Sequence, residues 1–203
     1  MKMPAEKRTR RAGGGKRLGV LDTAVEVLAD RGYESTRFAD VAAASGTAVS
    51  TLQNYFGSRE DMLIEALQRS TNQEVEALEA LAAAQAGPWE RLVALIDRSL
   101  GNSEQTQRML VEFWRSAMRD EELREHSERV QRGYREPFLR AIQEGCDQGL
   151  FHMKHSPEDV VDFLLTFLAG VTIPRVLHQN RPAENTLRDL LLSQMSVTLG
   201  REN

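Results

Sequence analysis

The chain has 203 residues, of which 28% are charged and 41% hydrophobic, and its formal net charge is −4. This length supports one or two domains with a substantial core, and the composition is that of a soluble globular protein. No signal peptide is expected, because the basic N-terminus runs into "AGGGKRLG" without an apolar segment. The longest uncharged apolar stretch, 163–174, falls well short of the roughly 20 residues that span a bilayer, so we expect a cytoplasmic protein.

Charge is distributed unevenly along the chain. Residues 1–60 carry ten Lys and Arg against seven Asp and Glu, a balance of +3, whereas the remainder carries 16 against 23, a balance of −7. A polyanion would therefore be attracted by the N-terminal third and repelled by the rest. The acidic total does not exclude DNA as a partner.

The first 15 residues, "MKMPAEKRTRRAGGG", are basic, glycine-rich and without apolar periodicity, which predicts a disordered arm. Such an arm is either a solvated tail or a DNA contact. A helix is expected from about residue 16 to residue 30, because Leu18, Leu21, Val25 and Leu28 have helical spacing and Gly32 can end the helix.

Residues 36–59 read as two short helices joined by a tight turn. Thr36 is the expected N-cap of the first helix, Gly46 suits the turn, and Thr47 can cap the second helix. That second helix, about 48–56, has Leu52 and Phe56 on an inward face and mostly polar residues outside. This spacing is typical of a helix-turn-helix, although an ordinary helical hairpin has the same pattern.

The rest of the chain reads as a series of longer helices. One is expected at 58–84, opened by Ser58 with Asp61 at the capping-box position, and five more at 88–100, 104–118, 121–148, from 156, and 183–199. Pro137 lies inside the third of these five and predicts a kink or a break, because proline cannot donate the helical hydrogen bond. The helix that begins near Ser156 is apolar on nearly all sides, so it must be buried on more than one side.

Residues 16–62 resemble the DNA-binding domain of the TetR family of bacterial transcriptional regulators. The stretch "VLDTAVEVLADRGYESTRFADVAAASG...TLQNYFGSREDML" carries the family's pattern of Arg-Gly-Tyr, Ala-x-x-Gly, Thr-Leu with Tyr-Phe, and Ser-Arg-Glu. The resemblance implies an all-α fold of about nine helices: a basic arm at 1–15, a helix-turn-helix domain at 16–62, and a helical effector-binding and dimerisation domain at 63–203. The chain departs from the family at "GTAVST" and at Gln53, which predicts an unusual operator.

The resemblance also implies the DNA contacts. Thr36 and Arg37 would meet phosphate or a base, and Arg59 would bind phosphate. The outward side chains of the second short helix have the chemistry to read base edges, since Gln and Asn pair with adenine, valine packs on a thymine methyl, and hydroxyls bond phosphates or bases. The groove-facing residues are expected to be Val49, Ser50, Thr51, Gln53, Asn54 and Tyr55.

Two apolar features of the acidic remainder call for an explanation. The surplus apolar surface of the last two helices predicts a homodimer across a two-fold axis, with Phe163, Val171, Leu187, Leu191 and Met195 at the interface. In the TetR family the last two helices form a four-helix dimer interface, and a dimer reads a palindrome. The alternative is that these stripes pack within the monomer.

A set of aromatic and methionine side chains is the second feature. By periodicity alone each is an ordinary core residue. The family resemblance, which for the C-terminal half is to the BetI-like branch, implies instead a cavity for a small apolar or amphipathic effector that acts through the long fourth helix. The residues expected to line it are Phe113, Trp114, Met118, Tyr134, Phe138 and Phe167.

Catalytic and metal-binding patterns are not evident. The sequence has no glycine-rich phosphate loop and no Gly-x-Ser-x-Gly elbow, and His152 and His155 beside "SPED" are expected to be solvated. We therefore expect no cofactor, no metal, and a ligand-responsive regulator, in the first place a repressor, that binds DNA as a homodimer. The alternative is a helical protein-interaction module that does not read DNA.

Overall fold

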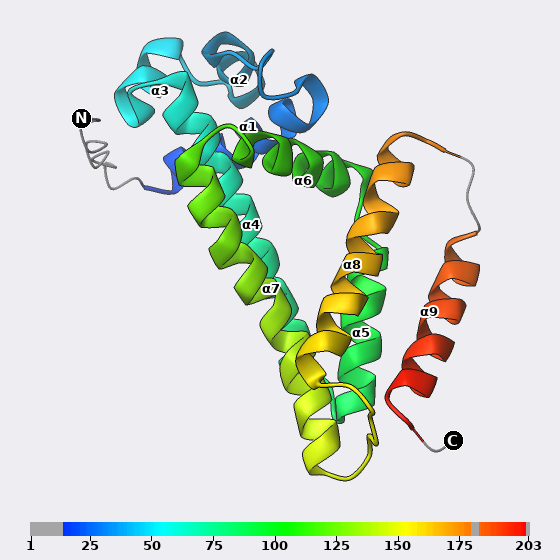
Figure 1. Cartoon of the computed structure of the whole chain (residues 1–203). Coiled ribbons are helices and arrows are strands. Elements are labelled where there is room, and N and C mark those ends of the chain that lie inside the picture. The colour runs from blue at the N-terminus through cyan, green and yellow to red at the C-terminus, as the bar shows by residue number, and fades with distance from the viewer. Residues whose placement is uncertain (1–13, 180–182, 202–203) are drawn as a thin grey trace, which may run out of the picture. The chain divides into compact units, whose positions relative to one another are not determined.

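A computed structural model gives the fold of residues 14–179 and 183–201 (Figure 1). The described part of the chain contains nine helices and no strand, which confirms the all-α prediction. The helices are α1 Gly15–Arg31, α2 Phe38–Ser45, α3 Val49–Phe56, α4 Arg59–Ala83, α5 Pro88–Leu100, α6 Glu104–Ala117, α7 Glu121–Asp147, α8 Pro157–Val176 and α9 Glu184–Thr198. None of these helices is long and apolar enough to cross a bilayer.

The chain divides into two compact units, one ending at Ser70 and the other beginning at Thr71. The first contains α1, α2, α3 and the beginning of α4, and the second contains the remainder of α4 and α5 to α9. The predicted arm lies almost entirely outside the described residues, and Gly15 already belongs to α1. The predicted domain end at residue 62 stays a prediction, and the compact unit around it extends eight residues further.

Glycines set the turns of the first unit. Gly46, with φ of +62°, ends α2 in a left-handed conformation that favours glycine, and Gly57, with φ of +80°, separates α3 from α4. Ser58 then opens α4, since its hydroxyl accepts a bond from the Asp61 amide at 3.0 Å and donates to the Asp61 carboxylate at 2.7 Å. The helix-turn-helix geometry therefore results from local residue chemistry.

Two local predictions for the first unit were wrong. Thr36 does not cap α2: Arg37 is the N-cap residue, and the Thr36 hydroxyl donates backwards to the Gly32 carbonyl at 2.8 Å. The apolar stripe of α1 also differs in part from the prediction: Leu21 and Leu28 are buried as expected, but Leu18 is exposed, and Val20 and Ala24 are buried in addition. Near the beginning of α1 the buried side chain is that of Arg17, and not that of Leu18.

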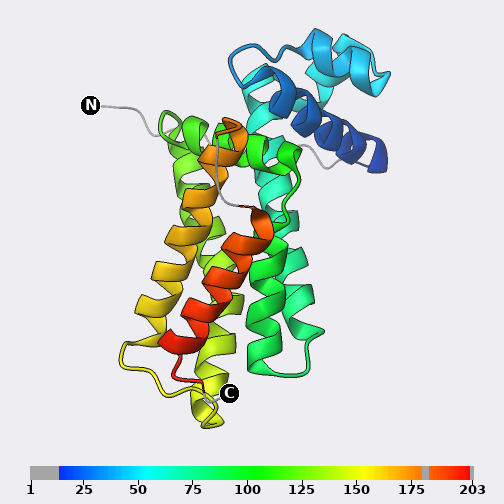
Figure 2. The ribbon, with the colours of Figure 1, turned by 90° about the vertical axis from the view of Figure 1, so that its right-hand side faces the viewer.

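The second unit is a helical bundle around one apolar core. In it α5, α7 and α8 pack against one another, α6 packs on α7 and α8, and α9 packs on α5 (Figure 2). Side-chain caps fix three helix starts, with Ser103, Asp120 and Ser156 each accepting a bond from a backbone amide of the next turn. Pro137 is buried inside α7, which continues through it, so the predicted break does not occur.

Candidate nucleic-acid interface and ligand cavity

The exposed face of α3 is formed by small polar and apolar side chains. Leu52 and Phe56 are buried beneath the helix, as the spacing predicted. No side chain caps α3, whose N-cap residue is Ala48, and Thr47 is buried in the turn before it. On the outer side Val49, Ser50, Gln53 and Asn54 are exposed, and Thr51 and Tyr55 are half-buried.

A helix with such a face can enter a B-DNA major groove. The predicted groove-facing residues thus lie together on one short helix, and none of them is charged. Glutamine and asparagine side chains pair with two atoms of an adenine edge, and a valine methyl packs on thymine. The face can read bases, but it offers no positive charge to phosphates.

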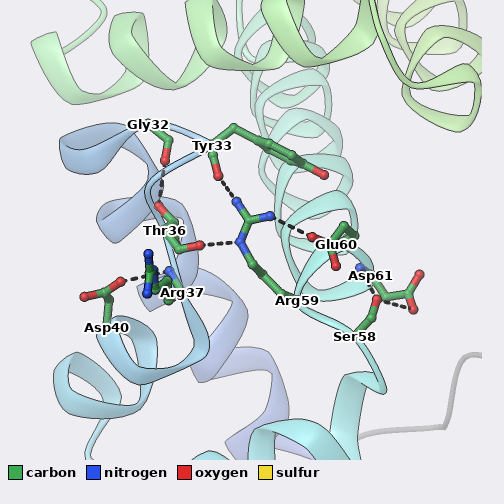
Figure 3. A network of polar contacts seen from close by, with 9 residues as sticks. All are labelled: Gly32, Tyr33, Thr36, Arg37, Asp40, Ser58, Arg59, Glu60 and Asp61. Carbon is green, nitrogen blue, oxygen red and sulfur yellow. Dashed lines mark hydrogen bonds and ion pairs between the residues drawn. The ribbon is translucent and has the colours of Figure 1, made fainter.

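Arg59 lies in a network that joins α4 to the segment before α2 (Figure 3). Its Nε donates to the Thr36 carbonyl and its Nη2 donates to the Tyr33 carbonyl. The third side of the guanidinium pairs with Glu60 at 2.7 Å, and the guanidinium carbon lies 5.3 Å from the centre of the Tyr33 ring. The Arg59 side chain therefore stabilises the first unit from within, because its N–H groups bond to two backbone carbonyls and a carboxylate.

Thr36, whose carbonyl accepts a bond from Arg59, is also held inside the first unit. Its side chain is fully buried, and its hydroxyl is bonded within the protein. Neither the Thr36 hydroxyl nor the Arg59 fork faces outward in this arrangement, unlike the phosphate contacts that the resemblance implied. Arg37, beside Thr36, is exposed, and its amide donates to Asp40 at 2.8 Å.

Sequence reasoning missed a second internal arginine. Arg17 of α1 is 5% exposed and forms two bonds to the Glu65 carboxylate of α4, at 2.5 and 2.7 Å. Its guanidinium also stacks over the ring of Phe56, the last residue of α3, at 4.6 Å. Arg17 thereby fastens the end of α3 to α1 and α4. The sequence carried no signal for this pairing, because Glu65 lies 48 residues further along the chain.

The second unit has a half-open cavity of about 500 Å³ among α5, α6, α7 and α8. Phe113, Trp114 and Tyr134 line it, together with polar side chains that the sequence alone would place in solvent. The other three residues predicted to line a cavity do not: Met118 is 73% exposed, Phe138 is fully buried in the core, and Phe167 packs against that core. The polar lining residues are Ser99, Asn102, Ser127, Gln131, Asp162, Thr166 and Thr172.

Hydrogen bonding fixes the direction of the Tyr134 hydroxyl. Ser99 donates its only hydroxyl hydrogen to the Leu95 carbonyl at 2.8 Å, so Tyr134 must be the donor in its 2.8 Å bond to Ser99. Burial raises the pKa of Tyr134 above its ordinary value. The phenol is therefore neutral at ordinary pH and has its lone pairs available to accept.

The predicted dimer residues are distributed over two environments. Phe163 is 53% exposed on α8, whereas Val171 and Leu187 are half-buried. Leu191 and Met195 belong to the core of the unit, so their assignment to an interface was wrong. The exposed apolar side chains of these two helices are instead Phe163, Ile173, Leu190 and Val197, and Leu177 comes directly after α8.

The histidines do not form a metal site. Within the described ranges no group of three or more His, Cys, Asp or Glu side chains is arranged to hold a metal ion. His152 and His155 are exposed, and His126 is buried with its Nε2 at 2.8 Å from the Thr71 hydroxyl. Arg115 and His178 do not line the cavity.

Two family models match the chain. Residues 88–199 match the C-terminal domain of BetI-type transcriptional repressors, and residues 20–66 match the tetR family of bacterial regulatory proteins. The chain is 31% identical over 83 residues to the fatty acid metabolism regulator protein of Bacillus subtilis (strain 168), which is 41% of this chain and 43% of that protein. It is 29% identical over 112 residues to the HTH-type transcriptional regulator BetI of Rhizobium meliloti (strain 1021), which is 54% of this chain and 55% of that protein.

Solved structures share the fold over nearly the whole chain. A putative transcriptional regulator from Saccharomonospora viridis, solved in complex with choline, superposes with a TM-score of 0.83 at 23% identity, covering 92% of this chain and 98% of that one. The transcriptional regulator FadR of Bacillus subtilis, solved in complex with stearoyl-CoA, gives 0.71 at 21% identity, covering 91% and 98%. At these identities the likeness concerns the fold.

Proposed function

Because this chain belongs to the TetR family of bacterial regulatory proteins, we propose that it is a ligand-responsive transcriptional repressor that binds a palindromic operator as a homodimer. The match of residues 88–199 to BetI-type repressors supports repression. Family and fold point to a regulator and not to an enzyme, and they disfavour a protein-interaction module without DNA readout. A protein that reads chromosomal DNA works in the cytoplasm, where that DNA is.

The observation that carries this proposal is the outer face of α3. Gln53 and its neighbour Asn54 are exposed, as are Val49 and Ser50 at the start of the helix. On the opposite side of α3, Leu52 and Phe56 are buried in the core of the unit. We assign base readout to Val49, Ser50, Gln53 and Asn54, with Thr51 and Tyr55 at the edges of the contact. We assign phosphate binding to the exposed Arg37 and a structural role to Arg59 and Thr36, which are bonded within the protein.

The dimer is inferred from the exposed apolar side chains of α8 and α9. Phe163, Ile173, Leu190 and Val197 are all more than half exposed on α8 and α9, and exposed large apolar side chains of this kind are typical of an interface. A two-fold dimer supplies two α3 helices, one for each half-site of a palindrome. We therefore place Phe163 at the interface and return Leu191 and Met195 to the core.

The cavity among α5, α6, α7 and α8 is the proposed effector site. None of its lining residues, which all lie in the described part of the chain, is Lys or Arg, and the lining carboxylate, Asp162, is paired with Arg135 at 2.8 Å. Aromatic faces attract cations, and the Tyr134 hydroxyl can only accept from a ligand because its hydrogen is bonded to Ser99. This chemistry favours an uncharged or cationic amphipathic effector and disfavours the phosphates of an acyl-CoA.

Calorimetric titration tests that effector class. Choline, its uncharged isostere 3,3-dimethylbutan-1-ol, and stearoyl-CoA are each titrated into the wild-type protein and into Trp114→Leu. We expect the cation or the alcohol to bind and the substitution to weaken binding. Tight binding of stearoyl-CoA, unaffected by Trp114→Leu, would contradict the proposed class.

Selection of bound fragments from sheared source DNA tests the operator proposal. The purified protein is incubated with the fragments at low and at moderate salt, and the bound fractions are sequenced. A palindrome that persists at moderate salt is the expected result, because base contacts add to the salt-sensitive phosphate term. Recovery of unrelated fragments that are lost at moderate salt would contradict sequence readout.

A further inference from the structure

Three hydroxyl groups of the cavity have their hydrogens bonded inside the protein. Ser99 of α5 donates to the Leu95 carbonyl at 2.8 Å, and Tyr134 of α7 therefore donates to Ser99 at 2.8 Å. On α8, the Thr166 hydroxyl donates to the backbone carbonyl of Asp162 at 2.7 Å. A hydroxyl has one hydrogen and two lone pairs, so these three oxygens can only accept a bond from a ligand.

A carboxylate adds a charged acceptor to the same cavity. The Nε of Arg135 donates to Oδ1 of Asp162 at 2.8 Å, whereas its Nη2 donates to the Glu158 carbonyl at 3.2 Å. The ion pair therefore uses one oxygen of Asp162 and leaves Oδ2 as an acceptor for a ligand. The pair is also exposed, since the Asp162 side chain is 65% exposed, and an ion pair so close to water holds its partners only weakly.

The other polar lining groups can adapt to either kind of ligand. Asn102 and Gln131 carry amides with both donors and an acceptor, and Ser127 and Thr172 carry hydroxyls. A ligand that only accepts could bond to these four side chains, but its lone pairs would face the three fixed hydroxyl oxygens and the carboxylate. An acceptor buried against another acceptor loses its bonds to water without replacement. A ligand that donates can satisfy both kinds of group.

We propose that the effector is an amphipathic primary or secondary amine that binds as its ammonium ion. Its N–H groups donate to the fixed hydroxyl oxygens and to the Asp162 carboxylate, and its apolar part packs on Phe113 and Trp114. The inference rests on the proposed function of this cavity as the effector site, and it narrows the effector class to cations with N–H donors. A quaternary ammonium ion has the same charge but no N–H group, so the cavity should discriminate against it.

Calorimetric titration with four ligands that share one octyl tail tests this class. Octylammonium has N–H donors and a positive charge, trimethyloctylammonium has the charge alone, octan-1-ol has an O–H donor without charge, and octanoate has only acceptors. At about pH 7 the amine is protonated, because an alkylamine such as the lysine side chain has a pKa of about 10.4. Octylammonium should bind tightest, and trimethyloctylammonium should bind at least roughly 10-fold more weakly, as expected for loss of a hydrogen bond from a charged donor.

Two conservative variants place the donation inside the cavity. Tyr134→Phe and Thr166→Val each remove one fixed acceptor, so each should weaken the binding of octylammonium and leave that of trimethyloctylammonium unchanged. The matched control is Thr23→Val in α1 of the first unit. The Thr23 hydroxyl likewise donates to the carbonyl four residues before it, that of Gly19, at 3.1 Å, but it lies outside the cavity. This control should change neither affinity.

The outcomes separate the amine proposal from the proposed function. Binding of trimethyloctylammonium, octan-1-ol or octanoate as tight as that of octylammonium would overturn the proposal, and so would an unchanged octylammonium affinity in both cavity variants. Failure of all four ligands to bind would overturn the cavity as the effector site. Operator selection from sheared DNA uses no ligand, so it tests DNA binding independently of these results.

Discussion

The two units of the molecule differ in where their uncharged polar side chains lie. In the first unit Arg17 and Arg59 are bonded inside the fold, and uncharged polar side chains cover the outer face of α3. In the second unit Arg98 and Arg188 form surface pairs with Glu74 and Asp97, Arg175 is buried, and uncharged polar groups line a half-open cavity. A fixed shape serves groove reading, whereas a cavity with spare hydrogen-bonding groups serves a ligand that comes and goes.

If this contrast holds, substitution of an internally bonded arginine has the largest effect on stability. Arg17→Ala leaves the half-buried Glu65 without its partner and should lower the free energy of unfolding of the first unit by about 3 to 5 kcal/mol. Hydrogen exchange of the amides in α1 and α3 reports this, because it separates the first unit from the second. The matched control is Arg17→Met/Glu65→Leu, which removes both charges and should recover most of the protection.

The contrast would break if Arg17→Ala left exchange in α3 unchanged. The stack on Phe56 and the pair with Glu65 would then add nothing measurable to a unit held by its apolar core alone. Equal loss in the single and the double variant would also contradict the role of the ion pair, since it would leave packing as the whole effect.

Arg59 is the second internally bonded arginine, and its substitution distinguishes a structural role from a phosphate contact. Arg59→Ala loses charge-assisted bonds to the Thr36 and Tyr33 carbonyls, at roughly 1.5 to 3 kcal/mol for such bonds. Binding to all DNA sequences should weaken while the salt slope stays at its wild-type value. A slope reduced by about 0.9 per protomer would instead place Arg59 on a phosphate. Arg59→Lys should not restore affinity, because lysine lacks the planar fork.

A base-reading residue of the same unit should act on specificity and not on shape. Gln53→Ala removes an exposed side chain and should relax the preference at one base-pair position by about 1 to 3 kcal/mol, with the fold unchanged. Comparison of variant operators in a competition binding assay measures this, and Gln73→Ala, an exposed glutamine of α4 in the second unit, is the control. An unchanged preference would remove Gln53 from the readout.

The sequence predicted the fold better than it predicted which side chains are buried, paired or exposed. Gly46, Gly57, Ser58 and Pro88 act within a few residues of themselves, so the helix ends near them were predictable. The pairing of Arg17 with Glu65 spans 48 residues and had no local signal. An arginine in a basic N-terminal region reads as a DNA contact until a carboxylate from another helix is seen beside it.

Adjacent residues of one helix show the same limit in the second unit. Leu190 is 61% exposed and Leu191 is 3% exposed, although both belong to one apolar stripe. Tyr134 lines the cavity, and Phe138, one turn later and stacked on it with ring centres 6.0 Å apart, belongs to the core. Periodicity identifies an apolar face, and only the packing of neighbouring helices divides that face among core, cavity and surface.

The smallest effect is expected in the cavity. Tyr134→Phe removes a bond to Ser99 but leaves Ser99 bonded to the Leu95 carbonyl, so the free energy of unfolding of the second unit should fall by only about 1 kcal/mol. The folded state raises the pKa of Tyr134, chiefly by burial, and this contributes stability that is fully present below the ordinary tyrosine pKa of about 10 and is lost as the pH rises through the folded-state pKa. Wild type and variant should therefore converge in stability above about pH 10, as measured by denaturant unfolding at about pH 7 and about pH 10.5. A stability difference that is independent of pH would mean that the pKa of Tyr134 is the same in the folded protein and in the unfolded chain. The region around Tyr134 would then be open to solvent, which would contradict its role as a binding site.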